Sequence, residues 1–105
     1  MIELKSAIQI VNGIHVDTWS LEVASFNILE VEAGTTGAKG GDTGHSGRTY
    51  LRLSDLGSTD LSVRVNKQGD FEYCEDIEIA FGGDSELHTF MEALNFALAT
   101  LSERE

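Results

Sequence analysis

Residues 71–81, FEYCEDIEIAF, are followed by two glycines and then by residues 84–103, DSELHTFMEALNFALATLSE. In the first stretch apolar and polar residues alternate, which is typical of a β-strand with one buried face. In the second, apolar residues recur every three or four positions, which predicts a C-terminal amphipathic helix over 84–103. Asp84 or Ser85 is expected to cap the start of this helix. The apolar stripe of the helix then needs the apolar face of a sheet to cover.

The same two-residue alternation occurs twice more in the second half of the chain, in residues 48–53 and 61–65. Together with residues 71–81, these segments predict a three-stranded antiparallel meander. Arg48, Arg52 and Arg64 share its polar face with acidic residues of the last strand, so we expect a ladder of cross-strand ion pairs.

In the first half, residues 2–10 alternate in the same way, and the Asn12-Gly13 pair predicts a tight turn into a second strand. Residues 19–32 are also strand-like, but the apolar positions change parity near Ser25, where we expect a β-bulge. The predicted fold is therefore α+β: an antiparallel sheet of four to six strands with a single C-terminal helix packed on one face.

The chain has 105 residues and is expected to form one domain over 1–105. Its 18 acidic residues against 7 Lys and Arg give a net charge of −11. Such a charge disfavours direct binding to nucleic acid or to an anionic membrane, because both depend on cations that neutralise phosphate. The single Cys74 excludes an intrachain disulfide and is typical of a reducing compartment, so a cytoplasmic location is expected.

Acidity is concentrated after residue 67, where ten carboxylates accompany a single arginine. A row of carboxylates on a rigid sheet and helix can imitate the charge spacing of a phosphate backbone and attract a surface lined by Arg and Lys. The residues predicted to bind such a basic partner are Glu72, Asp76, Glu78, Asp84, Glu86 and Glu92.

A glycine-rich loop, GTTGAKGGDTGHSG, occupies residues 34–47. It matches neither a P-loop nor a dinucleotide-binding turn, but its backbone N–H groups could hold a phosphate. This supports an alternative function, a small-ligand module that binds or sequesters a nucleotide signal. Its predicted ligand-binding residues are Lys39, Gly40, Gly41, Asp42, His45, Arg48, Tyr50 and Arg52.

Catalysis is not expected, because no nucleophile, base and orienting group occur in a recognisable arrangement. A metal-assisted hydrolase that uses Asp42 and His45 is a further alternative, although two possible ligands at this spacing are little support. No metal or cofactor is predicted. The sequence leaves open whether the protein is a monomer or a dimer.

In its size, its acidity and its lack of a catalytic signature, the chain resembles a class of small proteins that phages and mobile elements make against host defence. Anti-CRISPR proteins and DNA-mimic inhibitors belong to this class. The resemblance implies a non-enzymatic inhibitor that occupies the basic surface of a nucleic-acid-handling host protein, most specifically an RNA-guided nuclease. The partner would be a basic protein or a nucleoprotein.

Overall fold

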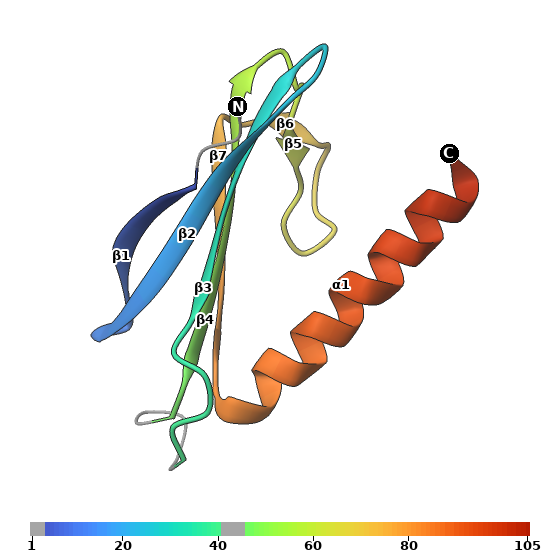
Figure 1. Cartoon of the computed structure of the whole chain (residues 1–105). Coiled ribbons are helices and arrows are strands. Elements are labelled where there is room, and N and C mark those ends of the chain that lie inside the picture. Colours follow the sequence, from blue (N-terminus) through green and yellow to red (C-terminus); the bar gives the residue numbers. More distant parts are fainter. Residues whose placement is uncertain (1–3, 41–45) are drawn as a thin grey trace.

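The computed structural model describes residues 4–40 and 46–105. It contains a five-stranded antiparallel sheet and one C-terminal helix (Figure 1), which confirms the predicted α+β fold. The strand order is β1-β2-β3-β4-β7, and a separate small sheet pairs β5 with β6. The elements are β1 (Lys5–Val11), β2 (Ile14–Ala24), β3 (Ile28–Thr35), β4 (Arg48–Gly57), β5 (Ser62–Val63), β6 (Glu72–Tyr73), β7 (Asp76–Gly82) and α1 (Asp84–Arg104).

The hairpin predicted at Asn12-Gly13 is confirmed, with both residues at positive φ (48° and 82°) between β1 and β2. The β-bulge expected near Ser25 is wrong, because the chain reverses there. Ala24 of β2 pairs with Ile28 of β3, so residues 19–32 form a second hairpin. A reversal and a bulge both change the parity of the apolar positions, and without Gly or Pro at residues 25–27 the pattern favours neither.

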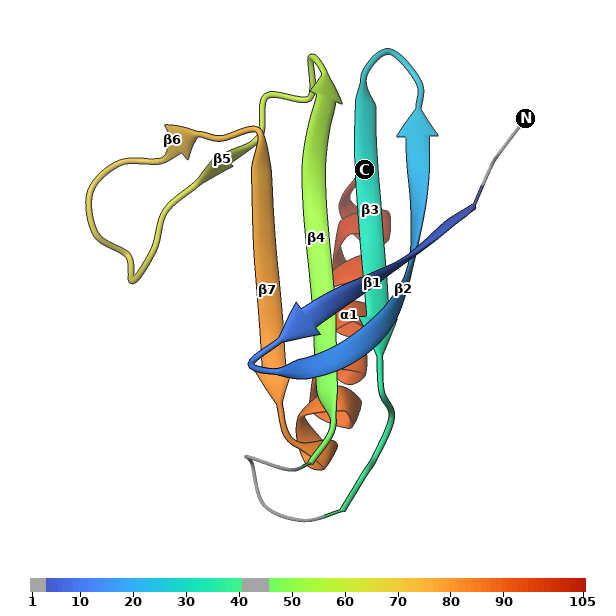
Figure 2. The ribbon, with the colours of Figure 1, turned by 90° about the vertical axis from the view of Figure 1, so that its left-hand side faces the viewer.

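The expected three-stranded meander is also wrong, because residues 61–65 do not enter the main sheet. β4 pairs directly with β7, and the chain between them projects from the sheet as the small β5–β6 hairpin (Figure 2). Residues with positive φ turn this segment too often for a long strand to form. The non-glycine residues with positive φ here are Ser58, Asp60, Asn66 and Lys67.

The two faces of the main sheet are covered by different elements. β1 and the first half of β2 curl across one face, whereas α1 lies on the other (Figure 2). The buried apolar side chains, Val11 of β1, Val16 of β2 and Tyr50 of β4, form one cluster between the curled strands and the sheet. On the opposite face, the Phe90 ring of α1 lies 4.6 Å from the Phe81 ring of β7, measured between centroids.

The helix has the predicted extent to within one residue at its C-terminus, but its start differs from the expectation. Gly83 is the N-cap residue, and no side chain caps the helix. The expected capping roles of Asp84 and Ser85 are therefore wrong. The carboxylate of Asp84 instead reaches the glycine-rich loop.

Candidate functional site: an acidic face of the sheet

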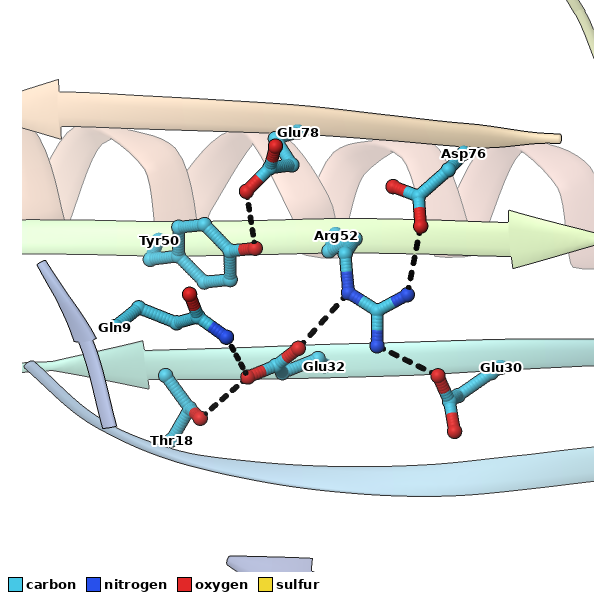
Figure 3. A network of polar contacts seen from close by, with 8 residues as sticks. All are labelled: Gln9, Thr18, Glu30, Glu32, Tyr50, Arg52, Asp76 and Glu78. Carbon is cyan, nitrogen blue, oxygen red and sulfur yellow. Dashed lines mark hydrogen bonds and ion pairs between the residues drawn. The ribbon is translucent and has the colours of Figure 1, made fainter. Parts of the chain in front are cut away.

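The face of the sheet opposite α1 carries charged side chains at alternate positions of three neighbouring strands. Arg52 of β4 lies at its centre and contacts three carboxylates (Figure 3). The Arg52 Nη2 atom is 2.6 Å from Glu30 Oε1, Nε is 2.8 Å from Glu32 Oε1, and Nη1 is 2.9 Å from Asp76 Oδ2. One guanidinium thus fixes the spacing of carboxylates from β3 and β7.

Glu32 is the most buried of these carboxylates, with 3% of the residue exposed. Its Oε2 atom accepts hydrogen bonds from Thr18 Oγ1 at 2.5 Å and from Gln9 Nε2 at 2.9 Å. Burial alone raises the pKa of Glu32, but these hydrogen bonds and the Arg52 guanidinium outweigh it and hold the pKa below its usual value. Glu32 is therefore ionised at neutral pH, although β1 and β2 cover it.

A second contact joins β4 to the edge strand β7 on the same face. The hydroxyl of Tyr50 donates a 2.6 Å hydrogen bond to Glu78 Oε2. Burial and the neighbouring Glu78 carboxylate both raise the pKa of Tyr50 far above its ordinary value. Tyr50 thus remains a neutral donor that orients Glu78.

The strand register adds one more carboxylate to this face. Glu22 of β2 pairs directly with Glu30 of β3, and directly paired residues of antiparallel strands share a face. Lys5 and Arg48 lie on the same side, but acidic residues still outnumber the cations. We call this surface the acidic face; it consists of Glu22, Glu30, Glu32, Arg52, Asp76 and Glu78.

The six residues predicted to bind a basic partner do not form one row. Asp76 and Glu78 lie together on the acidic face. Glu72 is exposed on the small β5–β6 hairpin. The remaining three belong to α1, on the other side of the sheet (Figure 2); they are Asp84, Glu86 and Glu92.

The sequence reasoning missed Glu22, Glu30 and Glu32, because it treated residues 19–32 as one strand. The hairpin at residues 25–27 places Glu22 opposite Glu30. A signal was present, since Glu30 and Glu32 alternate with Leu29 and Val31 as a half-buried strand requires.

The predicted ladder of cross-strand ion pairs forms at Arg52 and Asp76. Arg48 is 4% exposed and donates through Nη1 to the carbonyl oxygens of Ser46 and Gly47, at 3.1 and 3.0 Å. Arg64 lies outside the main sheet, 4.7 Å above the ring of Phe71, so its predicted place in the ladder is wrong.

The described part of the glycine-rich loop binds the carboxylate of Asp84. The backbone N–H groups of Lys39, Gly40 and Gly47 donate to it at 2.9, 2.6 and 2.8 Å. These three hydrogen bonds hold the pKa of Asp84 below its usual value. The loop amides do bind an anion, as the small-ligand hypothesis requires, but here the anion comes from the chain itself.

The residues predicted for the two alternative functions lie only partly within the described ranges. Gly41, Asp42 and His45 lie outside the described residues, so the metal-assisted hydrolase stays a prediction. Among residues 4–40 and 46–105, no three His, Cys, Asp or Glu side chains are grouped as metal ligands. Arg52, predicted to bind phosphate, is surrounded by carboxylates of the chain.

No family model, curated protein or solved structure matches this chain. The only helix in the described residues is not apolar enough to cross a membrane.

Proposed function

We propose that this protein is a non-enzymatic acidic binding protein that inhibits a nucleic-acid-handling partner, most specifically an RNA-guided nuclease, by occupying its basic surface. The acidic face is the observation that supports this proposal. Its carboxylates come from β2, β3 and β7, and Arg52 and Tyr50 of the intervening strand β4 hold several of them in place. Fixed charges lose little conformational entropy on binding, so such a surface favours a basic partner.

The structure also indicates which carboxylates remain available to a partner. Asp76 lies at the rim of the face, and its side chain is 46% exposed. Glu22 and Glu78 are exposed as well. Glu32 is covered by β1 and β2, so it holds Arg52 in place and is not itself exposed to a partner. A partner's Arg and Lys side chains would therefore contact Glu22, Asp76 and Glu78.

The experiment measures target-DNA cleavage by purified RNA-guided nuclease complexes with increasing amounts of this protein. We expect inhibition at stoichiometric amounts, weaker binding as the salt concentration rises, and protection of the nuclease when target DNA is bound first. In parallel, a tagged copy captures partners from a host lysate, and these are eluted by a salt gradient. If no nuclease is inhibited and no basic partner elutes with salt, the proposal is overturned.

A matched pair of variants separates the acidic face from the total charge. The triple variant Glu22→Lys, Asp76→Asn and Glu78→Gln changes the acidic face; Gln still accepts the hydrogen bond from Tyr50. The control, Glu103→Lys with Glu105→Lys, raises the net charge by the same amount at the exposed end of the chain. We expect only the triple variant to lose affinity, and equal losses in both would contradict a role for the acidic face.

A further inference from the structure

The chain exposes much more surface than a compact monomer of its size. Its solvent-accessible area is 7778 Å², against about 5,800 Å² for a folded monomer of 11.4 kDa. Its radius of gyration is 15.1 Å, whereas a compact domain of this length has about 13 Å. The excess, roughly 2,000 Å² by the same scaling, must lie on surfaces that this chain leaves uncovered.

One such surface is the sheet face that carries α1. We call it the apolar face; it consists of the odd-numbered residues in 19–23, 29–33, 51–53 and 77–81, all of them apolar. Trp19 is 58% exposed, Val23 is 52% exposed and Ile79 is 41% exposed. A continuous apolar surface of this kind on a chain of charge −11 is typical of a protein interface.

The helix has the complementary surface. Its first turns touch the sheet around a cavity of about 250 Å³ that Leu51 and Phe90 help to line. Beyond this point α1 leaves the sheet, and its C-terminal end lies far from it (Figure 1). Leu98 and Leu101 belong to the stripe that faces the sheet, yet they are 65% and 69% exposed.

We propose that a second copy of this chain covers the apolar face, so that the protein is a two-fold symmetric dimer. In each copy, the C-terminal half of α1 has no sheet to pack on, and part of the apolar face has no helix over it. In an isologous pair, the distal half of each α1 packs on the uncovered part of the partner's sheet, and both surfaces are buried at once. An excess near 2,000 Å² per chain is of the size that permanent homodimers bury.

Charge supports a second copy over an anionic lipid surface as the occupant. Asp55 pairs with Leu29 and so lies at the end of the apolar face, where the backbone N–H groups of Gly57 and Thr59 donate to its carboxylate. Apart from this hydrogen-bonded carboxylate the face is apolar, so two chains can meet there while their acidic faces point away from each other. Glu86 and Glu92, beside the apolar stripe of α1, are exposed and would repel anionic headgroups. This proposal does not depend on the proposed function, because a monomer could still bind a basic partner.

Sedimentation equilibrium of the full chain tests the proposal, with a dimer expected where the monomer is 11.4 kDa. Trp19 is the only tryptophan, so its fluorescence reports on the apolar face. In the dimer we expect blue-shifted emission and protection from acrylamide, both lost on dilution to monomer. A monomer at tens of micromolar with a solvent-exposed Trp19 overturns the proposal, and so does a dimer in which Trp19 stays exposed.

Paired substitutions then locate the interface. Leu98→Asp with Leu101→Asp is expected to weaken the dimer at least 100-fold. Val65→Asp with Phe71→Asp is the control, because these side chains are similarly exposed (71% and 63%) but belong to the segment between β5 and β6, outside the main sheet. If the first pair also unfolds the chain, the milder Leu98→Ala is measured for its dissociation constant. A dimer that these helix variants leave unchanged, or that the control weakens equally, overturns the interface.

Discussion

Replacing Arg52 by methionine removes the guanidinium that Glu30, Glu32 and Asp76 share while it keeps most of the apolar stem. The ion pair with the half-exposed Asp76 contributes at most about 1 kcal/mol. The larger cost comes from Glu32, whose side chain is 4% exposed and would remain charged without its cation. Removing one partner of a buried pair costs about 3–5 kcal/mol. Because the Arg52 side chain is itself 18% exposed and water can partly replace it, we expect about 2–4 kcal/mol.

The pH dependence of this loss follows from the pKa of Glu32. In the wild type that pKa is lowered, so the stabilising contribution of Glu32 is present above its usual value and is lost as the pH falls through the lowered one. Without Arg52 the pKa of Glu32 is higher than in the wild type, because only the hydrogen bonds from Thr18 and Gln9 then oppose the effect of burial. Protonation of Glu32 then removes the unpaired buried charge from the folded variant, so the loss of stability relative to the wild type becomes smaller as the pH falls through the variant's higher pKa.

The assay is urea unfolding at fixed protein concentration, followed by circular dichroism at several pH values. Arg64→Met is the control, because Arg64 is exposed and contacts the ring of Phe71 rather than a carboxylate. We expect the control to change the free energy of unfolding by less than about 1 kcal/mol at every pH. A loss below about 1 kcal/mol for Arg52→Met at pH 7, or an equal loss at pH 4, would refute the argued role of Glu32.

Three further predictions concern other contacts of the fold. Gly34→Ala would place a Cβ atom against the backbone oxygen of Asp17, so we expect a loss of about 1–3 kcal/mol in urea unfolding; an unchanged midpoint would contradict this close approach. Asp84→Asn should speed hydrogen exchange of the three loop amides that Asp84 binds, whereas amides of β3 keep their rates; unchanged loop rates would show that the loop does not need this carboxylate. Tyr50 and Tyr73 both have raised pKa values, so the midpoint of the alkaline ultraviolet titration should lie above pH 10 in the folded protein and return to about 10 in urea; a native midpoint near 10 would contradict both contacts.

The sequence by itself determined those strands, helices and turns that depend only on the order of neighbouring residues. Alternation and helical spacing predicted the strand at 48–53 and the helix after Gly83, because these periods record which face of an element is buried. The strand predicted over 71–81 is correct only in part, because residues 72–73 pair with β5 in the small sheet and only Asp76–Gly82 enters the main sheet. The Asn12-Gly13 turn was equally local, since both residues adopt positive φ at low cost. The alternation also placed Arg52 and Asp76 on one face.

The tertiary structure alone decided how those elements meet. A parity change near residue 25 fits a bulge or a reversal, and only the pairing of Ala24 with Ile28 distinguishes them. That pairing places Glu22 of β2 beside Glu30 of β3 on the acidic face, to which β7 also contributes carboxylates. Aspartate is a residue type that often caps helices, yet the Asp84 carboxylate accepts hydrogen bonds from backbone N–H groups 37–45 residues away in the sequence. Such contacts depend on register and on long-range approach, which single-residue preferences do not encode.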